Sequence, residues 1–154
     1  MVDPSPFRHH QPVQAALLWV SGGFIALGIF GFVPGITTSA TSPEFAGADS
    51  EAYLFGIFHV SVVHNVVHLA TGLAGLIALG KPRSARTFLA VAGVAYGVLA
   101  IYGWLLERSS APNVLPVNDA GDWLHFGMAF VMIALAIGAP GLSHTERRGQ
   151  RTLT

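Results

Sequence analysis

The chain has 154 residues, of which 52% are hydrophobic and only 10% are charged. Soluble domains usually carry about 25% charged residues, so this composition indicates a membrane protein. Eight basic and eight acidic residues give a net charge of zero, which argues against binding to nucleic acid. Because the chain has no cysteine, disulfides, thiolate metal ligands and cysteine nucleophiles are excluded.

Taken in chain order, four apolar stretches are each long enough to cross a membrane, which takes about 20 residues in a helix. They are Val13–Pro34, Tyr53–Gly80, Arg86–Leu106 and Asp122–Pro140. The pattern predicts an all-α integral membrane four-helix bundle at residues 13–140. A polar N-terminal tail at 1–12 and a basic C-terminal tail at 141–154 are expected to flank it.

The basic residues predict the direction in which the four stretches cross. One side of a four-span arrangement would carry Arg8, Lys81, Arg83, Arg86, Arg147, Arg148 and Arg151. The other side would carry only Arg108. Loops rich in Lys and Arg stay in the cytoplasm, so both termini are predicted to be cytoplasmic.

The second stretch carries a polar stripe. Counted from its first residue, Ser61, the next members follow three, four, seven and eleven positions later, which places them on one face of a helix. The stripe consists of Ser61, His64, Asn65, His68, Gly72 and Gly75. Polar side chains are costly at membrane depth unless they pair or line a cavity. We therefore predict a polar seam that faces other helices, and we assign Asn118 to the same seam.

Three chemical roles are open to the histidines. His64 and His68, four residues apart, could share a metal ion, with His125 or Asp122 as a further ligand. A divalent metal is therefore one candidate cofactor. Haem is another, with His59 or His64 opposing His125 as axial ligands. A proton relay is the third role, because imidazole accepts and donates protons near neutral pH.

A structural role is the alternative to all three. Imidazole and amide groups can hydrogen-bond to a neighbouring helix and fix the geometry of a bundle. We expect this to be the main role of His64, Asn65 and His68. Asn118 and Asp119 are predicted to cap the fourth helix.

Small residues predict where the helices pack closely. Gly93 and Gly97 form a GxxxG pattern in the third stretch, and Gly72 and Gly75 continue the polar stripe of the second. Small residues allow two helix backbones to approach in a membrane. We expect these glycines to serve packing within the bundle rather than dimerisation.

Five short motifs follow one another along the chain: Phe30–Thr37, Leu54–Phe58, His64–Leu69, Pro116–Asn118 and Asp122–His125. In sequence and order they resemble the bacterial DUF4383 family, over about residues 12–140. The resemblance implies a small four-span integral membrane protein of unknown activity. The positions that match recurrent polar positions of the family are His64, Asn65, His68, Asn118 and His125, whereas His59 stands where glutamine is expected.

The leading hypothesis is a non-enzymatic binding or accessory subunit of the bacterial cytoplasmic membrane. It would contact the lipid bilayer and either a membrane-protein partner or a second copy of the chain. The alternatives are a haem- or metal-binding redox protein and a proton-coupled carrier. Four short spans with only histidines as buried titratable groups argue against the carrier.

Overall fold

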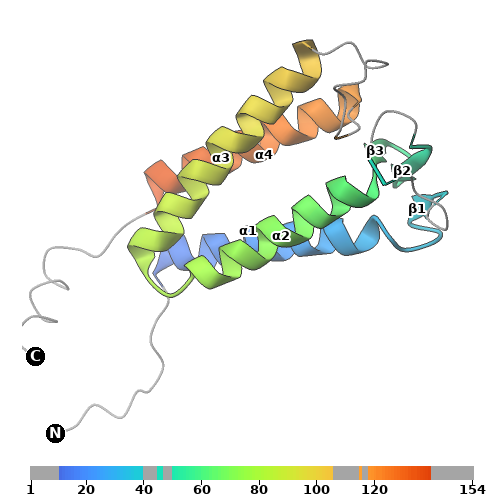
Figure 1. Ribbon diagram of the computed structural model, residues 1–154. Coiled ribbons are helices and arrows are strands. Elements are labelled where there is room, and N and C mark those ends of the chain that lie inside the picture. Colours follow the sequence, from blue (N-terminus) through green and yellow to red (C-terminus); the bar gives the residue numbers. More distant parts are fainter. Residues whose placement is uncertain (1–10, 40–44, 47–49, 106–114, 116–117, 140–154) are drawn as a thin grey trace, which may run out of the picture.

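The computed structural model describes residues 11–39, 45–46, 50–105, 115 and 118–139. These residues form the helices α1 (Pro12–Phe30), α2 (Val62–Ala78), α3 (Pro82–Leu105) and α4 (Asp119–Gly138) (Figure 1). They also form three short strands: β1 (Thr37–Thr38), β2 (Ala52–Leu54) and β3 (Phe58–Val60). The predicted all-α bundle is confirmed, with a small sheet that was not predicted. Most of both predicted tails, together with Arg8, Arg108, Arg147, Arg148 and Arg151, lies outside the described residues.

Among the described helices, α1, α3 and α4 are long and apolar enough to cross a membrane, with 19, 24 and 20 residues. The apolar helix α2 is shorter, with 17 residues. At about 1.5 Å per residue it spans about 26 Å, slightly less than the ~30 Å of a typical hydrocarbon core.

The prediction that one helix runs from Tyr53 to Gly80 is wrong at its start. Residues 52–60 form the antiparallel hairpin of β2 and β3, in which Tyr53 lies opposite His59. The turn of this hairpin has two successive residues in the left-handed region, Phe55 with φ 55° and Gly56 with φ 70°. A helix cannot pass through two such residues, so α2 begins only at Val62.

The four helices are arranged as two pairs, α1 beside α2 and α3 beside α4 (Figure 1). Glycines allow the close approach within each pair. A Cβ added at Gly72 would lie 2.6 Å from Cγ1 of Ile25 on α1, and one added at Gly93 would lie 2.7 Å from Cγ1 of Ile133 on α4. The predicted packing glycines therefore do face neighbouring helices, although Gly97 has more space, 3.7 Å from Cβ of Ala129.

An apolar cluster fills most of the space between the two pairs. Its buried residues come from α1, α3 and α4: Val13, Leu17, Phe24, Ala85, Leu89, Ala92, Tyr96, Ala129, Met132 and Ala136. The buried residues of α2 are instead polar or glycine: His64, Asn65, His68, Gly72 and Gly75. The predicted seam of the second stretch thus faces the inside of the bundle.

Two long polar side chains join helices at the end of the bundle away from the sheet. Arg86 of α3 donates hydrogen bonds to the carbonyl oxygens of Ala136 and Ala139, at the C-terminal end of α4. Gln14 of α1 donates to the carbonyl oxygen of Leu79, which caps α2, over 2.6 Å. Cationic and amide donors satisfy the last carbonyl groups of a helix.

Candidate metal centre

The histidines of the site are positioned by the capped beginnings of two helices. The side chain of Ser61 caps α2 by accepting a hydrogen bond from the backbone N–H of His64 over 3.2 Å. Asn118 caps α4 in the same way, accepting from the N–H of Gly121 over 3.0 Å. Because a cap fixes the first turn of its helix, both helices start with a defined rotation. Ser61 and Asn118, both assigned to the seam from the sequence, therefore act as caps. The predicted cap at Asn118 is confirmed, whereas Asp119 is the first residue of α4 rather than its cap.

Asn118 also ties α4 to the sheet. Its side-chain amide donates to the carbonyl oxygen of Ile57 over 2.8 Å, and its Oδ1 accepts from the backbone N–H of His59 over 3.4 Å. One side chain thus fixes the beginning of α4 relative to the β2–β3 hairpin. The site lies just beyond these caps, within the first two turns of α2 and α4.

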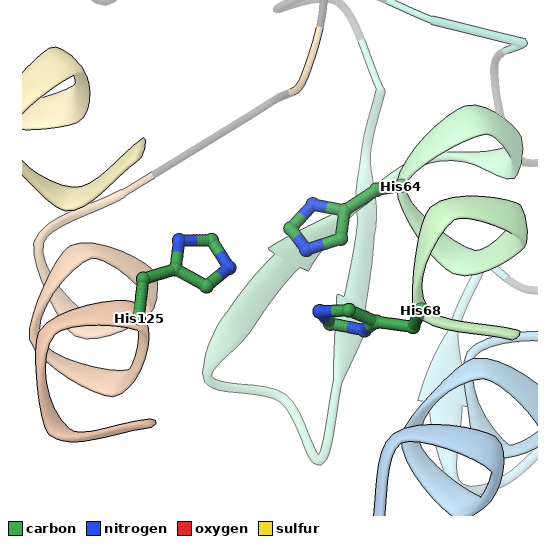
Figure 2. Close-up of side chains that lie close together, drawn as sticks. All are labelled: His64, His68 and His125. Carbon is green, nitrogen blue, oxygen red and sulfur yellow. The ribbon is translucent and has the colours of Figure 1, made fainter. Parts of the chain in front are cut away.

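Three histidines converge between α2 and α4. His64, His68 and His125 are 6%, 3% and 1% exposed, and Figure 2 shows their rings pointing toward one another from the two helices. Each offers one ring nitrogen, and these three atoms all lie within 4.8 Å of one another. We call these three residues the histidine cluster. Its members come from both helix pairs.

Aromatic rings cover the cluster on the side of the apolar core. The ring centroid of Tyr96 on α3 lies 5.5 Å from that of His125 and 6.1 Å from that of His68. Phe24 on α1 lies 5.7 Å from His68 and 4.9 Å from Tyr96. All four helices therefore contribute a ring to the cluster or to its cover.

Buried polar atoms at this place lack hydrogen-bond partners. Among the described residues, none accepts from or donates to either ring nitrogen of His68, Nδ1 of His125, or the side-chain amide of Asn65. The prediction that His68 and Asn65 form helix-to-helix hydrogen bonds is therefore wrong within the described residues. An unsatisfied buried polar group costs about 1–3 kcal/mol, so the arrangement calls for another explanation than bundle stability.

Asp122 does not belong to the cluster. The group of side chains with converging ligand atoms contains the three histidines without it. Its carboxyl group is fully buried and lies against Gly103 of α3, where an added Cβ would overlap it. The expectation that only histidines are buried titratable groups is therefore wrong. Gly103 was not singled out from the sequence. The signal was present, because Gly103 continues the line of small residues that begins at Gly93 and includes Ala100.

His59 is also separate from the cluster, and its prediction as a haem ligand within a helix is wrong. It lies on β3, where its Nε2 donates a hydrogen bond to the carbonyl oxygen of Ser50. Its ring stacks on that of Tyr53 with centroids 5.0 Å apart and an angle of 14° between the planes. Sequence spacing placed His59 in a helix because the turn at Phe55 was not recognised.

The fold and the site define a small helical membrane protein with a buried histidine cluster. Residues 14–138 match the family described as a domain of unknown function (DUF4383), and the chain belongs to that family. No curated protein and no solved structure matches the chain. The family description names no activity, so the function has to be argued from the site.

Proposed function

We propose that this protein binds a divalent transition-metal ion through His64, His68 and His125. The observation that carries the proposal is the convergence of three buried ring nitrogens within 4.8 Å. Both ring nitrogens of His68 and Nδ1 of His125 have no hydrogen-bond partner among the described residues, which leaves these atoms available as ligands. Imidazole is a preferred ligand of zinc, copper, iron and nickel.

The spacing of the nitrogens fits such an ion. Zinc binds imidazole nitrogen at about 2.0–2.1 Å, so tetrahedral ligands lie roughly 3.3 Å apart. Small side-chain rotations would bring the three nitrogens from their present separations to that spacing. Three protein ligands leave a fourth position for water or another ligand, which distinguishes reactive or exchangeable metal sites from closed structural ones.

A buried carboxyl group on the same helix as His125 supports the proposal. Three neutral imidazoles leave the ion with its full charge of about +2, which is costly among apolar side chains without a compensating anion. Asp122 is fully buried and precedes His125 by about one turn on α4. We assign Asp122 this compensating role rather than that of a ligand.

Haem fits the geometry less well than a single ion. Two axial histidines must stand on opposite faces of the porphyrin plane. The ring centroids of His64 and His125 are 5.4 Å apart, but His68 lies only 4.7 Å from the first and 6.2 Å from the second. A porphyrin between His64 and His125 would have to pass through His68.

The metal content of the purified protein tests the proposal. After loading with Co²⁺ or Zn²⁺ and removal of excess metal, the wild-type protein should retain one ion per chain. His68→Gln should reduce the affinity at least tenfold, because one of three ligands is lost. His59→Gln is the matched control, since His59 is buried in the sheet and outside the cluster. Metal retention that is equal in the wild type and in His68→Gln contradicts the proposal.

We infer that all four helices cross the bacterial cytoplasmic membrane, with both termini in the cytoplasm. Lys81, in the α2–α3 connection, and Arg83 and Arg86, in the first two turns of α3, support this orientation. Large apolar side chains on the outer faces, such as Trp19 and Leu105 at 82% exposure each, fit contact with lipid. The same faces could receive a membrane-protein partner or a second copy of the chain.

A further inference from the structure

A hollow lies between the end of α2 and the beginning of α3, at the end of the bundle away from the sheet (Figure 1). Its volume is about 580 Å³. It is lined by Ala78, Lys81, Arg83, Ser84, Thr87, Phe88 and Val91. We call it the α2–α3 hollow. Because α2 and α3 belong to different helix pairs, the hollow lies where the two pairs meet.

The lining of the hollow changes from charged to apolar along α3. Lys81 and Arg83 stand at the beginning of the helix, two hydroxyl side chains follow, and Phe88 and Val91 lie further along. Counted from Ser84, the next lining residues follow three, four and seven positions later, which places them on one helical face. Among the described residues that line the hollow, none is acidic. One end of the hollow is therefore cationic and the other end is apolar.

This change of character matches the layers of a membrane. Because α3 is long and apolar enough to cross the membrane, its first turn lies near a membrane surface. The headgroup layer on each side of the hydrocarbon core is about 5–8 Å thick. The five-residue step from Arg83 to Phe88 rises about 7.5 Å along a helix. The cations therefore lie at the level of the lipid phosphates when Phe88 lies at the edge of the hydrocarbon.

One basic residue of this region is turned away from the hollow. Arg86 donates hydrogen bonds to the carbonyl oxygens of Ala136 and Ala139 at the end of α4, and it does not line the hollow. Lys81 and Arg83 are exposed side chains that do line it. The fold itself thus uses Arg86, whereas the other two cations are presented to an occupant of the hollow.

An occupant that matches the whole lining has to combine an anion with a hydrocarbon chain. Phosphate oxygens accept hydrogen bonds from ammonium, guanidinium and hydroxyl groups, all of which line the cationic end. A soluble anion would leave the apolar end uncovered, and an apolar helix would leave the cations unmatched. A zwitterionic phospholipid carries its own positive charge beside the phosphate, so it complements two cations poorly. Basic pockets between membrane helices do bind anionic lipid headgroups.

We propose that the α2–α3 hollow binds one anionic phospholipid, with its phosphate at Lys81 and Arg83 and an acyl chain along Phe88 and Val91. This inference rests on the membrane crossing inferred above and goes beyond metal binding. The histidine cluster lies in the first two turns of α2 and α4, whereas the hollow begins at Ala78, the last residue of α2. The two sites are therefore at opposite ends of α2.

Native mass spectrometry of the full chain in detergent tests the cationic end. The wild type should retain one phosphatidylglycerol per chain, roughly tenfold more tightly than phosphatidylcholine with the same acyl chains. Arg83→Gln should weaken this binding roughly fivefold, because it removes one cation from the phosphate. Arg86→Gln is the matched control, since it removes an equal charge one turn away and glutamine can still donate to α4. Its binding should equal that of the wild type.

Two valines of α3 test the apolar end. Val91 lines the hollow and is 64% exposed, whereas Val98, two turns further along, is 61% exposed and does not line it. Val91→Trp should weaken binding of phosphatidylglycerol roughly fivefold, because the larger side chain occupies the place of the acyl chain. Val98→Trp should leave the binding unchanged.

Four results would each overturn the proposal. Equal retention of the two phospholipids would identify unselective lipid contact, and equal losses in Arg83→Gln and Arg86→Gln would identify an effect of net charge alone. Displacement of phosphatidylglycerol by inorganic phosphate would identify a site for small anions. Equal effects of Val91→Trp and Val98→Trp would place the acyl chain elsewhere. Metal content should stay at the wild-type value in every variant, and reporter fusions test the membrane crossing separately, so the three failures are distinguishable.

Discussion

At the scale of single residues, two asparagines near the site, one partly buried and one fully buried, have opposite surroundings. Asn118 uses its amide in a helix cap and in hydrogen bonds to the sheet. The side chain of Asn65 is fully buried, fits against Gly31 and has no hydrogen-bond partner among the described residues. Asn118 therefore stabilises the fold, whereas the fold alone gives no reason for an asparagine at position 65.

We predict that Asn65→Leu leaves the stability of the metal-free protein unchanged or raises it. Leucine has a similar shape, and removal of an unsatisfied buried amide relieves a cost of about 1–3 kcal/mol. Asn118→Leu should instead destabilise by about 1–2 kcal/mol, because it removes a helix cap. Chemical denaturation of both variants in the same detergent measures the difference. A larger loss for Asn65→Leu than for Asn118→Leu would mean that Asn65 is a structural residue.

At the scale of helices and strands, hydrophobic length predicted α1, α3 and α4 to within a few residues, except where α1 ends at Phe30 and α3 begins at Pro82. It misplaced the start of α2 because the segment 52–60 is as apolar as a helix but reverses direction at Phe55 and Gly56. The positive φ of Phe55 cannot be recognised from the amino-acid composition of this segment. The polar stripe itself survived this error, since His64, Asn65 and His68 all lie within α2.

The GxxxG pattern of α3 gives a prediction at this scale, because its two glycines have unequal space. A Cβ at Gly93 would lie 3.2 Å from the backbone oxygen of Ala129 and from the backbone nitrogen of Ile133. One at Gly97 would make an ordinary 3.7 Å contact with Cβ of Ala129. We therefore expect Gly93→Ala to destabilise by about 1–3 kcal/mol through overpacking. Gly97→Ala should be neutral or slightly stabilising, because alanine is the better helix former.

Thermal unfolding of the two alanine variants checks this expectation. Equal melting temperatures would show that α3 and α4 can separate at Gly93 without cost, contrary to the close packing of this pair.

At the scale of the whole molecule, the orientation in the membrane decides whether the sheet and the histidine cluster lie near the cytoplasmic or the opposite side of the membrane. Reporter fusions at Ser84, in the first turn of α3, and at the C-terminal Thr154 should report a cytoplasmic position, because the basic residues cluster on that side. A fusion at Ala48, which lies outside the described residues, should report the opposite side. A cytoplasmic signal from Ala48 would reverse the orientation inferred from charge.

The site, too, is a property of the whole molecule rather than of one helix. Spacing along the sequence could place His64 and His68 on one face and His125 near the start of its helix. It could not show that α4 turns His125 toward α2, because that rotation depends on the Asn118 cap and on the Asp122 carboxylate packed against Gly103. The cluster forms only when both helix pairs are assembled.

A metal ion held by α2 and α4 would therefore link the two helix pairs, and its binding should raise the stability of the whole bundle. An ion that binds only the folded state stabilises it by about 2.7 kcal/mol at a free concentration of 100 times its dissociation constant. We expect Zn²⁺ to raise the unfolding free energy of the wild type and of His59→Asn by this amount. His125→Asn should abolish the increase, because it leaves both ligands on α2 and none on α4. Stabilisation of His125→Asn equal to that of the wild type would show that Zn²⁺ acts elsewhere than at the link between the pairs.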